Sequence, residues 1–158
     1  MAITLDWYIR PNNPSVTNVI PDDFNFSYDL LNDTIRKTLR YEEREYGINL
    51  GWGNTDTGDN IRFQRPSGSK APIVYEEDIA ICVNNGKWVK YGEREYGINL
   101  VWSDDPVFEW KIKGQSPGVV VTKDQIVGLS NNVVPPSPKT VMYGERRYGI
   151  NLVWSNVQ

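Results

Sequence analysis

Apolar residues recur at every second position in several short stretches of the chain, most clearly at Ile98, Leu100 and Trp102. A period of two indicates a half-buried β-strand, with these side chains facing the core and Asn99 facing outward. The β-rich stretch just before it and the polar Gly-Glu-Arg-Glu between them predict a hairpin over residues 88–102. Gly97 inside the second run indicates a bulge or a close backbone approach. Tyr91 and Tyr96 are expected to stack across this hairpin.

The stretch that contains this turn is written three times in the chain. YEEREYGINLGW occupies residues 41–52, YGEREYGINLVW residues 91–102 and YGERRYGINLVW residues 143–154. The copies begin about fifty residues apart. Copies at this spacing indicate a repeat architecture, in which each unit buries its apolar face against its neighbours. Each copy closes its unit, so the sequence predicts one domain, 1–158, made of three repeats: 1–52, 53–102 and 103–158.

The residues before each copy of the motif also match, although weakly. Each repeat opens on a short aromatic stretch that predicts a first strand: residues 5–10, 60–65 and 108–113. A second β-rich run follows in each repeat: residues 22–28, 76–83 and 123–129. The later two repeats then carry an Asn-Asn turn, at 84–85 and 131–132. With the motif hairpin, this pattern predicts four strands per repeat.

One stretch competes with this all-β interpretation. Residues 28–40, YDLLNDTIRKTLR, are the only candidate for a helix. Thr34, Ile35 and Thr38 weaken it, because β-branched side chains lose rotamer freedom in a helix. The sequence therefore favours strands here as well.

The in-phase pattern of three four-stranded repeats extends over the whole chain. Three such units can close around a threefold axis and remove their free sheet edges. The pattern resembles the β-trefoil, which implies an all-β fold with pseudo-threefold symmetry. A three-sheet β-prism and a three-bladed toroid are alternatives, but a short opening strand followed by a terminal hairpin fits the trefoil better.

Polar residues of the motif are identical in all three copies, whereas the residues between the copies have diverged. The identical side chains are a glutamate, an arginine, a tyrosine and an asparagine: Glu43, Arg44, Tyr46, Asn49, Glu93, Arg94, Tyr96, Asn99, Glu145, Arg146, Tyr148 and Asn151. Cores tolerate exchange among aliphatic residues at modest cost, so packing alone does not explain this polar identity. It indicates either a polar network at the axis or a binding site built three times.

These side chains suit a carbohydrate ligand. Carboxylate, guanidinium and amide groups bind paired hydroxyls, and a tyrosine ring stacks on the C–H face of a sugar. The repeated YGERxYGINLVW resembles the β-trefoil lectins, which implies a non-catalytic lectin with up to three glycan sites that gain by avidity. The chain departs from the ricin-B branch of that family. Leucine stands two residues before each motif tryptophan, where that branch carries the Gln of its Gln-x-Trp signature.

Two alternatives stay open beside this hypothesis. Trefoil lectins commonly bind sugars in outer pockets, which implies a competing site near Asp22, Glu77 and Asp124. Other trefoil proteins bind proteins, either as protease inhibitors or as receptor-binding components of toxins. The Pro-rich stretch 135–138 is the candidate for an inhibitory loop.

The residue inventory argues against catalysis. The chain has no histidine, the commonest general base and metal ligand, so no enzyme activity and no cofactor are predicted. Two copies of the motif hold a pair of carboxylates, Glu43 with Glu45 and Glu93 with Glu95, but Arg147 breaks the pair in the third. Carboxylates in a turn are expected to be solvated and not arranged for glycoside hydrolysis.

Charge and cysteine content narrow the partners further. A net charge of −3 and no basic run beyond 35–40 argue against a nucleic-acid partner. The single Cys82 lies in an apolar strand pattern, is expected in the core, and favours a reducing compartment. The acidic stretch 54–60 lacks EF-hand spacing and is expected to be a polar loop. The N-terminal stretch predicts synthesis in the cytoplasm without a signal peptide, and no stretch is long enough to cross a bilayer. Release from the cell and a homodimer both stay open.

Overall fold

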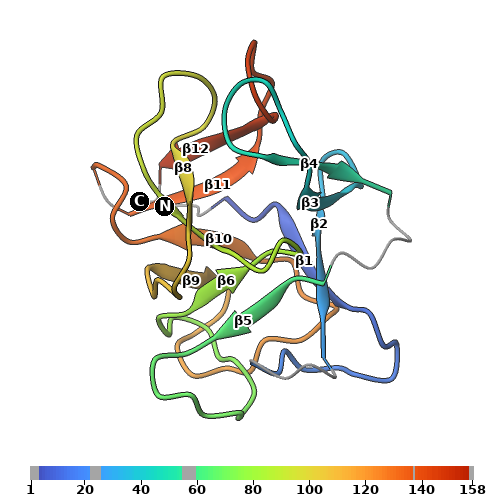
Figure 1. Ribbon diagram of the computed structural model, residues 1–158. Helices are drawn as coiled ribbons and strands as arrows, with labels where there is room; N and C mark the ends of the chain where they lie inside the picture. Colours follow the sequence, from blue (N-terminus) through green and yellow to red (C-terminus); the bar gives the residue numbers. More distant parts are fainter. Residues whose placement is uncertain (1–3, 22–25, 55–59, 137, 157–158) are drawn as a thin grey trace.

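The computed structural model describes residues 4–21, 26–54, 60–136 and 138–156, and these ranges contain strands and no helix. The strands are β1 (Trp7–Pro11), β2 (Tyr28–Asn32), β3 (Thr38–Tyr41), β4 (Leu50–Gly53), β5 (Arg62–Gln64), β6 (Ala80–Cys82), β7 (Trp88–Tyr91), β8 (Leu100–Ser103), β9 (Trp110–Lys113), β10 (Gly128–Asn131), β11 (Lys139–Tyr143) and β12 (Leu152–Asn156). Each repeat forms one four-stranded antiparallel sheet (Figure 1). The predicted all-β class is confirmed.

The sheets are meanders with matching registers. Strands pair in chain order within each repeat, β1 to β4, β5 to β8 and β9 to β12. Equivalent apolar residues, all buried, lie opposite each other in the three sheets: Ile9 and Leu30, Phe63 and Ile81, Ile112 and Leu129. Such cross-strand pairs stabilise a sheet and fix its register. The three repeats therefore have the same internal structure despite their different sequences.

The three sheets are joined in a cycle through the opening strand of each repeat. Antiparallel bridges link each of these strands, or the residue just before it, to the preceding repeat: Trp7 to Val127, Ile61 to Tyr28, and Trp110 to Ile79. The third repeat thus pairs back onto the first, and no repeat is terminal. The result is a trefoil-like fold of three repeats.

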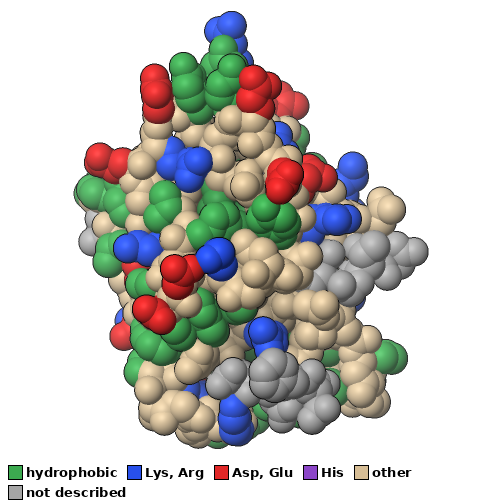
Figure 2. Space-filling model, in the orientation of Figure 1, with side chains coloured by type: hydrophobic (Ala, Val, Ile, Leu, Met, Phe, Trp, Pro, Cys, Tyr) green, Lys and Arg blue, Asp and Glu red, His purple; other side chains and the backbone are tan. Residues whose placement is uncertain are grey.

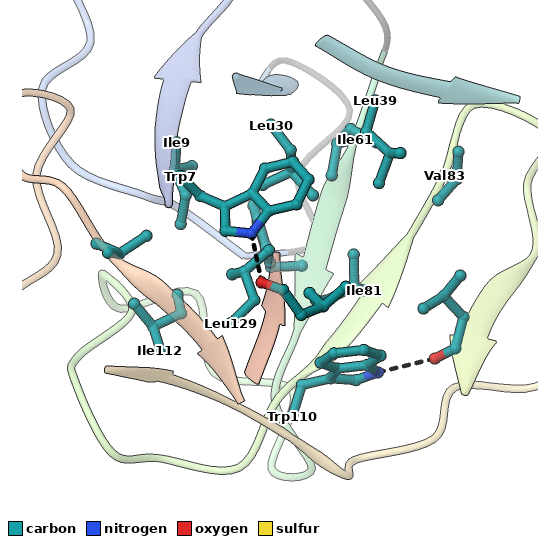
Figure 3. Packing of buried hydrophobic residues seen from close by; sticks show 14 of the residues in the cluster. Trp7, Ile9, Leu30, Leu39, Ile61, Ile81, Val83, Trp110, Ile112 and Leu129 are labelled. Carbon is teal, nitrogen blue, oxygen red and sulfur yellow. Dashed lines mark hydrogen bonds between the residues drawn. The ribbon is translucent and has the colours of Figure 1, made fainter. Parts of the chain in front are cut away.

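One apolar cluster drawn from all three repeats fills the centre (Figure 3). The motif contributes the same two residues from each copy, all at most 2% exposed: Ile48, Leu50, Ile98, Leu100, Ile150 and Leu152. The Trp7 indole N–H donates to the Val141 carbonyl at 2.8 Å, and that of Trp110 donates to the Val89 carbonyl at 2.9 Å (Figure 3). These buried polar groups are thereby satisfied while their rings fill the core.

The first repeat forms strands where the sequence offered a candidate helix, and its second strand begins later than predicted. The candidate helix over 28–40 is absent, because β2 and β3 occupy its ends. The strand expected at 22–28 begins only at Tyr28, and residues 22–25 lie outside the described ranges. Leu30 explains the difference, since it is the residue that faces buried Ile9 across the sheet.

The motif hairpins form as predicted, but with longer loops. Tyr91 pairs with Leu100, so the second-repeat loop runs from 92 to 99. Gly97 and Ile98 belong to this loop and not to the strand, which corrects their expected placement. Ile98 is nevertheless buried, because the loop turns this residue back onto the core. Trp102 is half-buried and packs against the same cluster.

Candidate functional site

Three motif loops meet at one end of the molecule, which we call the apex (upper end of Figure 1): residues 42–49, 92–99 and 144–151. Their closest approach is at a glycine. A Cβ on Gly97 would lie 3.2 Å from the Cα of Gly47 and 3.4 Å from the Tyr148 carbonyl oxygen. Gly97 also has φ of +80°, a region that favours glycine. The close backbone approach predicted for this glycine is confirmed, although it joins loops and not strands.

A closed ring of arginine contacts joins the loops. Each guanidinium donates through Nη2 to a glycine carbonyl of another loop: Arg44 to Gly149 at 2.9 Å, Arg94 to Gly47 at 2.8 Å and Arg146 to Gly97 at 2.8 Å. Within each loop, an asparagine Oδ1 accepts the backbone N–H of that arginine at 2.9 Å: Asn49 from Arg44, Asn99 from Arg94 and Asn151 from Arg146. We call these contacts the apex network. They give the identity of Arg and Asn in all three copies a structural basis.

Tyrosine rings gather at the same place. Tyr46, Tyr96 and Tyr148 contact one another edge to face, with ring centroids 5.0 Å apart in every pair. Tyr96 therefore packs against the other repeats, and the expectation that it stacks on Tyr91 is wrong. Tyr46 and Tyr96 are 38% and 40% exposed. Figure 2 shows hydrophobic side chains flanked by acidic and basic ones at this end of the molecule.

An open cleft of about 530 Å³ lies between the first and third loops. Its volume falls in the range of small-molecule sites. Its walls are formed by Glu43, Arg44, Glu45, Tyr46, Arg146, Arg147, Tyr148, Gly149 and Asn151. Six of these residues were predicted as site residues from the sequence, and the fold brings them together from segments about a hundred residues apart.

The cleft offers charged side chains that the fold itself does not use. Glu43 and Glu45 are exposed, and neither makes a hydrogen bond or an ion pair within the described part of the chain. The Arg147 guanidinium lies over the Tyr148 ring, 5.3 Å from its centroid, and has no other partner among the described residues. By contrast, Arg44 and its counterparts are held in the apex network. The groups available to a ligand are therefore two carboxylates, one guanidinium and the tyrosine rings.

Two of these residues, Glu45 and Arg147, were not predicted as site residues. They occupy the fifth motif position, which reads Glu, Glu and Arg in the three copies. The predicted site residues are those identical in all three copies, and this criterion excludes the fifth position. The feature of the sequence that points to Arg147 is its change of charge within an otherwise constant polar stretch.

The other predicted motif residues lie outside this cleft. The second loop carries Glu93, Arg94, Tyr96 and Asn99, and Glu145 is exposed in the third. All the predicted motif residues thus lie in the three loops at the apex. Their contact with a ligand stays a prediction.

The residues of the competing outer site lie in separate surroundings. Asp22 falls outside the described residues. Glu77 forms an ion pair with Arg65 at 2.8 Å. Burial opposes the ionisation of Glu77, but hydrogen bonds from Arg65 and the Val74 N–H outweigh it and hold its pKa below the usual value. Asp124 lines a pocket of about 290 Å³ with Tyr8, Arg10, Leu31, Arg36 and Lys123.

The other described residues singled out in the sequence lie away from the cleft. Cys82 is 2% exposed, so its predicted core position is confirmed. Among the described residues, no group of His, Cys, Asp and Glu is arranged to hold a metal ion. Residues 55–59 of the acidic stretch and residue 137 of the Pro-rich stretch lie outside the description. No helix capable of crossing a membrane is found in the described ranges.

Comparison with known proteins assigns no family. No protein-family model matches the chain, and no match is found among curated proteins or among solved structures.

Proposed function

We propose that the protein binds carbohydrate, without catalysis, in the cleft between the first and third motif loops. The observation that supports this most is the combination, in one open cleft, of the exposed Tyr46 ring with carboxylates and a guanidinium that make no ion pair among the described residues. A tyrosine ring offers a face for sugar C–H groups. Carboxylates accept hydrogen bonds from hydroxyls, and a guanidinium donates to them.

The apex network supports the proposal by holding the walls in place. The bond from Arg44 to the Gly149 carbonyl fixes the first loop against the third. A prearranged site loses less conformational freedom on binding. In this proposal the arginines and asparagines of the network position the walls, and the sugar is contacted by Glu43, Glu45, Tyr46, Arg147 and Tyr148.

Binding is preferred over catalysis for a chemical reason. The chain holds no histidine, and the cleft carboxylates are exposed at a loop tip. A general acid normally needs a buried, apolar setting that keeps its proton at neutral pH. The threefold repeat also allows related sites between the other loop pairs, so a lectin with up to three sites is the broader form of the proposal.

A glycan array probed with the labelled wild-type protein tests the proposal, followed by titration calorimetry on the sugars that bind. The cleft variant is Glu43→Gln with Glu45→Gln. The matched control is Glu93→Gln with Glu95→Gln, which makes the same change in a loop that does not line this cleft. We expect the cleft variant to lose roughly tenfold to a hundredfold in affinity, because hydrogen bonds to charged groups are lost.

The outcomes separate the possibilities. Thermal melts must first show that both double variants stay folded. If the control loses as much as the cleft variant, the sites are shared among all loops and a single cleft is excluded. If wild type binds no glycan, carbohydrate binding is wrong and protein partners become the next search.

A further inference from the structure

The described cleft is distinguished by the sign of one charge. The first and second loops carry Glu45 and Glu95 at the fifth motif position, whereas the third carries Arg147. The ring of arginine contacts shows that the third loop faces the first as the first faces the second. Glu45 therefore stands toward the second loop where Arg147 stands toward the first. A ligand in the described cleft therefore meets the cation Arg147. A ligand in the equivalent place between the first and second loops would meet the anion Glu45.

The Arg147 guanidinium is free to bind an anion. It stacks on the Tyr148 ring, and a guanidinium in that position keeps the N–H groups at its edge available. Neither Glu43 nor Glu45 pairs with it within the described residues. Arg44 and Arg146 also line the cleft, but their Nη2 atoms are bound to glycine carbonyls. Arg147 is thus the cation of the cleft that is not already engaged with the backbone.

We infer that Arg147 makes this cleft selective for an acidic saccharide, and this inference rests on the proposed carbohydrate binding. A carboxylate or sulfate on the sugar would bind the guanidinium edge, whose paired N–H groups match two oxygens of such an anion. Hydroxyls of the same saccharide would donate to Glu43 and Glu45 on the facing wall. The two carboxylates disfavour a ligand that is anionic throughout, so the anion must be confined to one end.

The test compares three probes that share one sugar backbone. They are a neutral oligosaccharide that ends in one hexuronic acid, the same oligosaccharide after reduction of its carboxyl group, and the reduced form carrying one sulfate. Each is titrated by calorimetry into wild type, Arg147→Glu and Lys37→Glu. Arg147→Glu gives the third loop the residue that the other two carry, so it is compatible with the loop structure. Lys37→Glu makes the same change in net charge at an exposed turn before β3, at the strand end away from the motif loop.

Wild type and Lys37→Glu are expected to bind the acidic probe about tenfold more tightly than the reduced one. Arg147→Glu is expected to abolish this preference, so that its affinity for the acidic probe is no higher than its affinity for the reduced probe. The sulfated probe distinguishes carboxylate from sulfate recognition. If wild type binds acidic and reduced probes equally, or Arg147→Glu keeps the preference, the inference is wrong while carbohydrate binding stands. If no probe and no arrayed glycan binds, the proposed function fails and the inference with it.

Discussion

Two sets of contacts join one repeat to another with different chemistry: the apex network, and the hydrogen bonds made by the backbone N–H groups of Tyr41, Tyr91 and Tyr143, which we call the belt. At the apex, each join uses the same arginine and the same glycine carbonyl. In the belt, the backbone N–H of the first motif tyrosine is bound by a different side chain each time: Tyr41 by Asn84, Tyr91 by Glu109 and Tyr143 by Asp6.

The difference follows from what each join requires. A backbone N–H needs only one oxygen within reach, and Asn, Glu and Asp all supply it. At the apex, a guanidinium must reach a neighbouring loop, and a glycine must hold a positive φ against two other backbones. Arginine alone meets the first requirement, and glycine meets the second. Identity among the copies therefore marks the joins that only one residue type can make, whether or not a ligand also binds there.

The largest effect is expected in the belt, where a single buried carboxylate serves several donors. Asp6 accepts from Asn32 Nδ2, Thr34 Oγ1 and the Tyr143 N–H, and it is only 5% exposed. Asp6→Ala should cost about 4 kcal/mol of unfolding free energy, because it leaves these donors without an acceptor. Urea unfolding measures the loss.

The control for this prediction is Asn84→Ala. Asn84 is exposed and serves only the Tyr41 N–H among the described contacts. Water can replace it, so the expected cost is about 1 kcal/mol or less. Equal losses in the two variants would show that the belt contacts are interchangeable in strength as well as in chemistry.

The next effect tests the close approach at the apex. Gly97→Ala adds a Cβ that would meet another loop's backbone at 3.2 Å, in addition to the strain of φ at +80°. We expect a loss of about 3 kcal/mol. Gly86→Ala is the matched control, since Gly86 has φ of +79° but nothing within 4 Å of the added atom. It should lose about 1 kcal/mol from strain alone. Thermal and urea unfolding that give both variants the same loss would refute the steric part.

A smaller effect is expected from the arginines. Arg94→Ala removes the bond to the Gly47 carbonyl from a partly buried guanidinium and should cost about 2 kcal/mol. Arg146 makes the equivalent bond while exposed, so Arg146→Ala should cost about 1 kcal/mol or less. Arg94→Lys should recover little, because an ammonium lacks the reach and the planar fork of a guanidinium. Denaturant midpoints rank the three variants, and a reversed order would contradict the burial argument.

The strands could be predicted because each one repeats a local pattern. Alternation at Ile98 and Leu100 indicated buried positions, and the structure confirms them. The start of β2 was misplaced because the stretch before Tyr28 is also β-rich, and only the pairing of Leu30 with Ile9 fixes the register.

The apex was harder to predict because its contacts cross between repeats. The identity of Arg94 and Asn99 suits a ligand site as well as a network, and only the approach of three loops shows the network. The cleft depends further on Arg147, whose significance lies in facing a different loop. No sequence spacing within one repeat encodes that neighbour.

The smallest effect concerns a pair of positions that distinguishes the first hairpin from the other two. The first hairpin has Glu42 and Gly51, where the second has Gly92 and Val101. A Cβ on Gly92 would lie 2.7 Å from Val101 Cγ1, and one on Gly51 would lie 2.9 Å from Glu42 Cβ. Only one of the two positions can therefore carry a side chain, and the third hairpin follows the second in this respect.

Replacing both Glu42 and Gly51 by the residues of the second hairpin should leave stability nearly unchanged, whereas replacing Gly51 alone should lower it. Gly51→Val alone should cost about 2 kcal/mol, because the valine meets Glu42. Glu42→Gly with Gly51→Val should lie within about 0.5 kcal/mol of wild type, since it reproduces the second hairpin. It gives up only the 3.6 Å ion pair of Glu42 with Arg44, in which both side chains are partly exposed. A double-mutant cycle from urea unfolding measures this coupling. Additive losses would mean that the two side chains do not compete for one space, and that the difference between the hairpins has another cause.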